Sequence, residues 1–343
     1  MKIAIHQREH SYSDAWISYC EEKKIQYKLV DCYQSDIIDQ ISDCDILMWH
    51  FHHAIPEDIL FARQLLFSVQ ASGKVIFPDF STMWHFDDKI GQKYLLEAIG
   101  APLVPSFVFY SKADAYRWIN TTSFPKVFKL RVGASSHNVR LIETRAQARQ
   151  LVKKAFSYGF RQYHIWFTLQ ESIRKANINE ATWFDVLKSF ARLFIRTDFE
   201  KFAGREKGYI YFQDFIPDNE TDTRIVIIDG KAFGFKRLVR KNDFRASGSK
   251  QRILDRDQID EDTLKISFSL AKSLKLQIVA IDYIYRNEEP LIVELSYGTM
   301  PSSYRLCEGY WDENLNFHKE PVDFGSWIIE KVIKDFITKQ SLS

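Results

Sequence analysis

The chain has 343 residues, of which 45% are hydrophobic and 15% aromatic, enough to fill the cores of about two or three compact domains. Its 47 basic and 45 acidic residues leave a formal net charge of +2, which excludes a broad electrostatic surface for nucleic acid. Four cysteines without a CxxC pair indicate reduced thiols. Because there is neither a signal-peptide pattern nor an apolar stretch of roughly 20 residues, we expect no membrane span and a cytoplasmic location.

The first part of the chain alternates short apolar runs with helical patterns, which predicts a parallel, Rossmann-like sheet. No GxGxxG fingerprint follows the first strand, so a dinucleotide dehydrogenase is disfavoured and a substrate-binding or scaffolding role is expected. Strands are expected at Lys2–His6, Tyr27–Val30, Ile46–Trp49 and Val75–Phe77, with helices over 13–23 and 87–99.

The second half of the chain shows a different order of elements. A helix-leaning stretch over 163–208 has the pattern of an insertion or a lid. Turns at Asp229-Gly230 and over 287–290 predict two hairpins, and Glu261–Ser273 predicts a helix between them with one apolar face. Strands are expected at Tyr209–Phe215, Arg224–Ile228, Val279–Tyr285 and Leu291–Leu295, and a last helix over about 324–337.

A lysine-bearing strand followed by a loop of small residues lies between these parts. The run Phe124–Lys129 ends in Lys129, and the loop after it contains Gly133, Ser135 and Ser136. Small residues let backbone N–H groups approach phosphate oxygens, and a lysine neutralises their charge. An ordinary hairpin with a small-residue turn is the alternative.

Two carboxylates stand on apolar strands that a turn joins. Asp282 and Glu294 are expensive to bury unless a cation compensates them, and hard oxygen ligands suit Mg²⁺ bound to phosphate. The alternative is a pair of salt-bridged residues at the strand ends. A basic run supplies potential partners for such bridges: Lys236, Arg237, Arg240, Lys241 and Arg245.

Over residues 88–301 this order of motifs resembles the ATP-grasp superfamily, which includes D-alanine:D-alanine ligase, glutathione synthetase and the ligases that add glutamate to ribosomal protein. The resemblance implies an α/β fold of the α+β ATP-grasp type, in which an N-terminal Rossmann-like parallel sheet precedes a two-lobed ATP-grasp module. It implies three domains: a Rossmann-like domain at 1–86, a first lobe with phosphate loop and helical insertion at 87–208, and a second lobe with metal site and C-terminal tail at 209–343.

The resemblance also implies roles for single residues. Arg224, Arg237 and Arg245 would act on the reacting phosphate, whereas Asp282, Glu294 and Ser296 would bind Mg²⁺. Ser296 stands where the family has asparagine, which is a departure from its metal site. The residues implied to bind ATP are Lys89, Lys129, Gly133, Ser135, Ser136, Gln213, Asp214, Phe215, Ile216 and Asp222.

The activity that the resemblance implies is an ATP- and Mg²⁺-dependent ligase that joins a carboxylate to an amine through an acyl phosphate. A kinase that phosphorylates a hydroxyl, and a non-catalytic nucleotide-binding module that Ser296 keeps open, are the alternatives. The C-terminal tail also resembles ATP-grasp proteins of bacterial surface-polysaccharide biosynthesis, which suggests a glycan precursor, such as a uronic acid, as the small-molecule substrate. A homodimer is left open.

Two further clusters remain. His50, His52 and His53 follow the third strand and are expected to form a polar strand end, which can contact substrate together with His85, rather than a metal pair. The aromatic stretch over 302–312 is either a stacking platform for a sugar or a packed loop.

Overall fold

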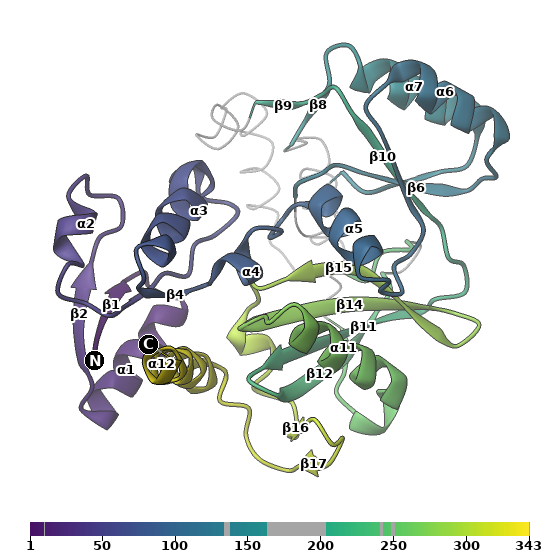
Figure 1. The fold of residues 1–343 in the computed structure, drawn as a ribbon. Helices are drawn as coiled ribbons and strands as arrows, with labels where there is room; N and C mark the ends of the chain where they lie inside the picture. The colour runs from purple at the N-terminus through teal and green to yellow at the C-terminus, as the bar shows by residue number, and fades with distance from the viewer. Residues whose placement is uncertain (10, 134–137, 163–203, 241–242, 248–250, 343) are drawn as a thin grey trace, which may run out of the picture. The chain divides into compact units, whose positions relative to one another are not determined.

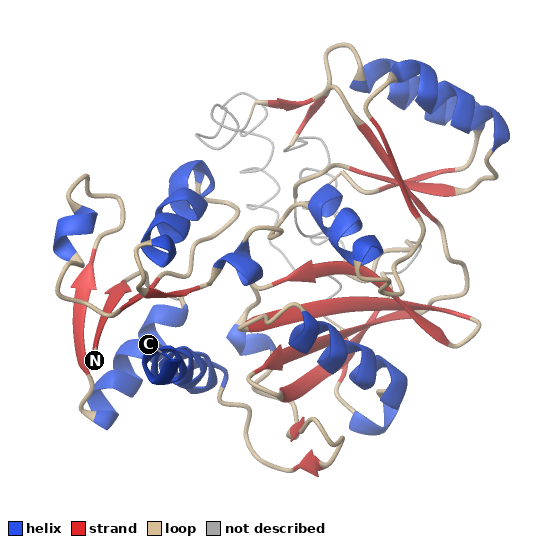
Figure 2. Ribbon diagram, viewed as in Figure 1, coloured by secondary structure: helices blue, strands red, loops and turns tan. Residues whose placement is uncertain are grey.

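The structure is a computed structural model that describes residues 1–9, 11–133, 138–162, 204–240, 243–247 and 251–342. Ser135, Ser136 and almost all of the predicted insertion over 163–208 lie outside these residues. The chain forms two compact units, one of Met1–Phe86, Leu96–Pro102 and Asp218–Ser343, the other of Asp87–Leu95 and Leu103–Pro217. Both units mix helices with sheets (Figures 1 and 2).

The first unit opens with a four-stranded parallel sheet in the order β2-β1-β3-β4, as the sequence predicts. Helices α1 and α12 pack against each other beside this sheet, and α3 contacts β4. The elements are β1 (Lys2–His6), α1 (Tyr12–Lys23), β2 (Gln26–Val30), α2 (Ile37–Gln40), β3 (Ile46–Met48), α3 (Pro56–Ala71), β4 (Val75–Phe77), α4 (Phe80–Met83) and α12 (Phe324–Leu342).

The same unit contains a larger, antiparallel sheet in the order β15-β14-β11-β12-β16-β17, with β13 paired to β12. Helix α11 (Glu261–Ser273) has the predicted bounds and covers one face of it through Leu264, Phe268 and Ala271. The strands are β11 (Thr221–Ile228), β12 (Lys231–Leu238), β13 (Arg252–Ile253), β14 (Ile278–Arg286), β15 (Glu289–Ser296), β16 (Tyr310–Trp311) and β17 (Phe317–His318), with single 3₁₀ turns at Arg256–Gln258 and Pro301–Ser303.

Strand β12 is absent from the sequence prediction, although the turn at Asp229-Gly230 was expected. Gly234 stands in the middle of β12, where a glycine weakens the strand pattern. The structure gives the reason for this glycine, because a Cβ atom there would lie 2.1 Å from the carbonyl oxygen of Arg224 on β11. Close approach of two backbones thus hides a central strand from a propensity argument.

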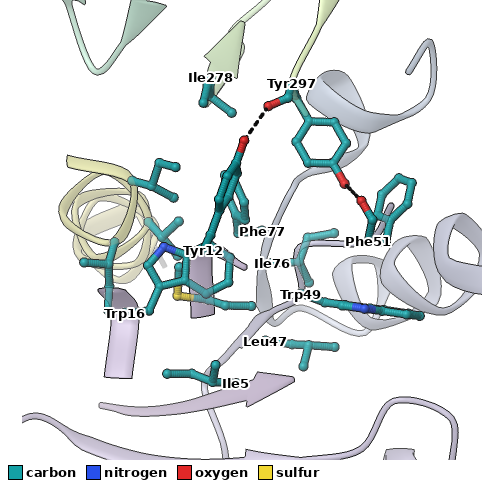
Figure 3. Close-up of a cluster of buried hydrophobic side chains, with 14 of the residues drawn as sticks. Ile5, Tyr12, Trp16, Leu47, Trp49, Phe51, Ile76, Phe77, Ile278 and Tyr297 are labelled. Atoms are coloured by element: carbon teal, nitrogen blue, oxygen red, sulfur yellow. Dashed lines mark hydrogen bonds between the residues drawn. The ribbon is translucent and has the colours of Figure 1, made fainter. Parts of the chain in front are cut away.

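Both sheets of the first unit share one apolar core. Val226, Phe233, Ile278 and Ala280 project from the face of the antiparallel sheet opposite α11 and join the core of the parallel sheet. Figure 3 shows part of it, with Tyr12 and Trp16 of α1 beside Ile278 and Tyr297. The two sheets of this unit are therefore held together by buried aromatic and aliphatic side chains.

The second unit is built on an antiparallel sheet in the order β5-β10-β6-β7, whose core includes Phe128, Phe212, Ile119 and Val152. Helix α5 begins in this unit. The elements are α5 (Lys89–Ala98), β5 (Ser106–Phe109), α6 (Lys112–Thr121), β6 (Lys126–Lys129), β7 (Arg140–Ile142), α7 (Arg145–Ala155), β8 (Phe160–Arg161), β9 (Arg205–Glu206) and β10 (Ile210–Asp214). Within the described part of the chain, no helix has the length and apolarity to cross a membrane.

Candidate functional site

Lys129 lies on a polar face of the second unit. In the antiparallel pair of β6 and β10 it stands opposite Tyr211, and its buried ammonium donates to Gln213 Oε1 at 2.6 Å. Gln213 Nε2 and the Tyr211 hydroxyl both donate to Ser106 Oγ, at 3.1 and 2.8 Å. The Lys129 side chain is therefore fixed through Gln213 by a buried network of neutral groups.

Lys126 belongs to the same strand but points to the opposite face. Its ammonium lies 2.6 Å from Asp214 Oδ1 and above the rings of Phe107 and Trp118, at 5.5 and 5.8 Å from their centroids. This separates two residues that the sequence grouped together, because the side chain of Gln213 lies with Lys129 and that of Asp214 lies with Lys126. Phe215 and Ile216 follow the end of the strand.

Lys89 lies beside the start of the small-residue loop. Its ammonium donates to the Gly133 carbonyl at 2.8 Å, and Gly133 N–H donates to Asp87 Oδ1 at 2.8 Å. The Lys89 backbone N–H donates to Arg131 O at 2.9 Å, which ties the start of α5 to the end of the lysine strand. Gly133 has φ +113°, a conformation that favours glycine. The structure thus brings together Lys89 and Gly133, two of the predicted phosphate contacts.

One end of the antiparallel sheet in the first unit carries a set of charged residues on a single face. Directly opposed residues on neighbouring antiparallel strands project to the same side. Arg224 is opposite Asp282, Asp282 is opposite Glu294, and a bulge follows at Tyr283. Asp222 is opposite Arg237, and Ser296 follows Glu294 at the spacing of two that keeps it on that face.

Two arginines and two aspartates of this face form a charge-balanced, buried cluster. Arg224 donates from Nε and Nη2 to the two carboxylate oxygens of Asp282, at 2.6 and 2.7 Å. Arg237 Nη2 lies 2.8 Å from Asp282 Oδ2, and its Nε donates to Asp222 Oδ1 at 2.7 Å. Both arginines are thus held bidentately or by two carboxylates, which is the strong geometry for a guanidinium.

The two aspartates of the cluster differ in protonation. Burial alone would raise the pKa of Asp282, but the guanidiniums of Arg224 and Arg237 outweigh it and hold that pKa far below its ordinary value. For Asp222 burial prevails over Arg237, and its pKa is raised. Asp282 is therefore the member of the cluster that stays ionised under all ordinary conditions.

The donor set at this face suits Mg²⁺. Asp282, Glu294 and the hydroxyl of Ser296, which donates to Gly298 O at 2.9 Å, offer only oxygen atoms. Both oxygens of Asp282 are engaged by arginine, so a metal there must take the place of guanidinium contacts. Among the residues that the structure describes, no group of three or more His, Cys, Asp or Glu side chains surrounds a common point.

The salt-bridge alternative of the sequence is realised for Asp282, with Arg224 and Arg237 as its partners. Only Arg237 belongs to the basic run. Arg245 instead pairs with Asp243, two residues earlier, at 2.6 Å. Lys89 and Lys129 belong to one compact unit and Asp282 and Glu294 to the other, so their convergence on one nucleotide stays a prediction.

The histidine cluster and the aromatic stretch are placed in the first unit. His50 stacks on Tyr12, with ring centroids 3.6 Å apart, and His52 stacks on His53 at 4.4 Å. His85 is buried with its ring edge-on to Trp84. Tyr304 is a core residue packed on Phe233 and Phe324, so the packed-loop alternative holds for it, while Leu306 is 68% exposed.

Sequence reasoning missed the residues that orient the candidate side chains. Ser106 holds Gln213 and Tyr211, and Tyr12 holds both His50 and Thr299. A buried pair of Arg8 with Asp58, at 2.9 Å, fixes the chain beside His50. The alternation of β5 marks Ser106 as a polar residue among apolar ones, but its importance depends on a partner about a hundred positions away in the chain.

Three comparisons relate the chain to known proteins. Residues 199–303 match the model of the RimK-like ATP-grasp domain. A search of curated proteins finds no match. Many solved structures match, and three span the chain at low sequence identity, so their likeness concerns the fold.

The first is a D-alanine–D-alanine ligase from Bacillus anthracis complexed with ATP, with 12% identity, 99% coverage of both chains and a TM-score of 0.57. A RiPP-associated ATP-grasp ligase from Chryseobacterium gregarium, in complex with ADP and a leader and core peptide, has 12% identity, 97% coverage of both chains and a TM-score of 0.56. A biotin carboxylase domain from Hydrogenobacter thermophilus in complex with MgADP and bicarbonate has 11% identity, covers 97% of this chain and 69% of its own, and has a TM-score of 0.58.

These findings confirm the resemblance that the order of motifs predicts. Parallel and antiparallel sheets follow one another along this chain as in the matched folds, and the matched domain includes the carboxylate strands β14 and β15. By its fold and by its RimK-like domain at residues 199–303, the chain is an ATP-grasp protein.

Proposed function

We propose that this protein is an ATP- and Mg²⁺-dependent ligase that joins a carboxylate to an amine. The observation that carries the proposal is the charged face of the antiparallel sheet, where Asp282 and Glu294 stand opposite each other and Arg224 and Arg237 supply positive charge beside them. Carboxylates are poor electrophiles, and transfer of the γ-phosphoryl group from ATP to the carboxylate gives an acyl phosphate that an amine attacks with loss of phosphate. The work of the protein is to position these groups and compensate their charge.

The residues divide into nucleotide, metal and phosphoryl-transfer contacts. Mg²⁺, when bound, neutralises phosphate charge and orients the transferred group. We assign Asp282, Glu294 and Ser296 to the metal, and Arg224, Arg237 and Arg245 to the transferred phosphate. Contacts to ATP are assigned to Lys89 and Lys129 for the other phosphates, Gly133, Ser135 and Ser136 for the covering loop, Gln213, Asp214, Phe215 and Ile216 for adenine, and Asp222 for ribose.

The charge balance of the cluster gives this assignment a physical basis. Two guanidiniums currently neutralise two carboxylates. A divalent cation at Asp282 replaces the positive charge there and frees the guanidiniums for phosphate oxygens, so the buried face stays close to neutral at each stage. An Asp282 carboxylate without either partner would be a costly buried charge.

For the substrates we propose a glycan precursor, such as a uronic acid, as the source of the carboxylate, and an amino acid as the amine. The support is the C-terminal tail, whose half-buried Tyr310 and Trp311 lie on the short hairpin of β16 and β17. A peptide carboxylate is the second candidate, because the matched ligase from Chryseobacterium gregarium is in complex with a leader and core peptide. The three-domain division at 1–86, 87–208 and 209–343 is part of the same proposal.

The test is an incubation of the protein with ATP, Mg²⁺, hydroxylamine and a panel of acids that includes glucuronic acid, D-alanine and glutamate-containing peptides. Hydroxylamine captures an acyl phosphate as a hydroxamate, so a ligase gives hydroxamate and ADP in equal amounts with its own acid. A phosphorylated product without hydroxamate indicates the kinase. Calorimetric binding of ATP without any turnover indicates the non-catalytic module.

A further inference from the structure

His50 is oriented from three sides within the first unit. Its ring lies parallel to that of Tyr12, at an interplanar angle of 3° and 3.6 Å between centroids. Nδ1 is 2.8 Å from Ser11 Oγ, and the backbone carbonyl of His50 accepts from Arg8 at 3.2 Å. An imidazole at the carboxyl end of a parallel strand, where ligands of open α/β sheets bind, is thereby held in one orientation.

The second ring nitrogen of His50 is the unusual feature. Nε2 is shielded from solvent and has no hydrogen-bond partner among the described residues. A buried polar atom left without a partner costs about 1–3 kcal/mol and calls for an explanation such as a bound ligand or water. The fixed ring, with one nitrogen satisfied and the other left open, is the arrangement of a preorganised contact for a ligand.

Tyr12 connects this ring to the carboxylate strand. Its hydroxyl donates to Thr299 O at 2.6 Å and accepts from Thr299 N–H at 2.8 Å, and Figure 3 shows it reaching toward the backbone at Tyr297. Thr299 follows Ser296 by three residues, and the charge of Arg224 acts on the Tyr12 hydroxyl. His50 is therefore tied to the face that carries Asp282, within one compact unit.

The chemistry around Nε2 favours an uncharged donor. Burial first, and then the positive fields of His52 and Arg8, lower the pKa of His50 to about 3, so the ring is neutral. The one carboxylate next to this segment, Asp58, is fully buried and bonded to Arg8, Tyr33 and the His52 N–H. A neutral ring cannot compensate the charge of a substrate carboxylate, whereas it can accept a hydrogen bond from an N–H group.

We propose that His50 Nε2 accepts a hydrogen bond from the amino group of the acceptor and positions that amine for attack. This inference rests on the proposed ligase function and names the residue that serves its amine. Nδ1–H then donates to Ser11 Oγ, and Nε2 is the acceptor. An amine that donates one N–H to Nε2 keeps its lone pair for the acyl carbon. His50 acts as a positioning residue.

The experiment compares His50→Phe, which keeps the stack on Tyr12 and removes both nitrogens, with His50→Gln, which returns an acceptor near Nε2. His318→Phe on β17 is the matched control. With the acid that gives hydroxamate, and glycine as the amine, we expect the KM for glycine to rise roughly tenfold in His50→Phe, as for loss of one hydrogen bond, and to recover in part in His50→Gln. The KM for ATP, and hydroxamate formation at high hydroxylamine concentration, are expected to stay unchanged.

Two outcomes overturn the inference. One is an unchanged KM for glycine in a folded His50→Phe protein. The other is an equal rise in the KM values for ATP and glycine, which indicates a structural role. If wild-type protein forms no hydroxamate with any acid, the ligase proposal fails separately, and ¹⁵N spectra of the histidines titrated with glycine amide decide the subsite. A shift of the Nε2 signal supports it, and an Nε2 signal that saturating amine leaves in place, as for a bound water only, rejects it.

Discussion

Arg224 holds both carboxylate oxygens of Asp282, at 2.6 Å from Nε and 2.7 Å from Nη2, across the paired strands β11 and β14. The residue proposed for phosphate and the residue proposed for metal are thus bonded to each other when neither ligand is present. Such a pair keeps two buried charges neutral, and it makes the arginine available only when another cation takes over the carboxylate.

Asp282→Asn is expected to destabilise the protein by about 3 kcal/mol, because Arg224 loses its bidentate partner and stays buried with its charge. Urea unfolding measures this, with Asp229→Asn, whose partner Lys334 is exposed, as the control. Adding Arg224→Met is expected to recover most of the stability. Binding of MgADP by calorimetry is expected to lose its Mg²⁺-dependent part in both variants. Full Mg²⁺ dependence in Asp282→Asn would contradict the metal assignment.

His50 predicts a dependence of stability on pH. The unfolded chain binds a proton at this residue below about pH 6.5, whereas the folded chain resists until about pH 3, because burial lowers the pKa there. The free energy of unfolding is therefore expected to fall as the pH decreases through this window. Urea unfolding at about pH 7.5 and about pH 5 tests the sign. His50→Phe should show a smaller loss, with a remainder from His6, whose pKa burial also lowers.

Lys129→Ala is expected to abolish ATP turnover and leave the fold intact. Its ammonium bonds to the neutral oxygen of Gln213, so its removal leaves no opposing charge at that contact, and the substrate phosphates lose a positive group. Circular dichroism and thermal unfolding establish the fold, and ADP release measures turnover. Ordinary turnover by a folded variant would rule out Lys129 as a phosphate contact.

Lys126→Met is the contrasting change on the same strand. It leaves the carboxylate of Asp214 without its partner at 2.6 Å and removes the ammonium above Phe107 and Trp118, so a loss of roughly 2–4 kcal/mol in stability is expected. At a temperature where it is folded, this variant should retain ATP turnover. Loss of turnover with unchanged stability would mean that Lys126, and not its neighbour, meets the phosphates.

The sequence allowed the order of elements and the polar residues of the site to be predicted, because both depend on local patterns. Alternation located β11, β14 and β15, and carboxylates on apolar strands identified Asp282 and Glu294. Pairings between distant residues were out of reach. The opposite faces of Lys126 and Lys129 depend on which strand residue meets β10, and the contact of Tyr12 with Thr299 joins residues 287 positions apart.

Gly234 tests the one central strand that sequence patterns missed. Its missing side chain lets β12 lie against β11, where a Cβ atom would stand 2.1 Å from Arg224 O, and backbone cannot yield as a flexible side chain can. Gly234→Ala is expected to destabilise the protein by about 1–3 kcal/mol or more through this overlap. Because the strained carbonyl belongs to Arg224, the variant should also weaken MgADP binding. Ala232→Gly, two residues earlier on the same strand, is the control, since it removes a methyl group without adding an overlap. Equal stability of Gly234→Ala and wild-type protein in urea would mean that β11 and β12 pair in another register, and the ion cluster built on that register would then be wrong as well.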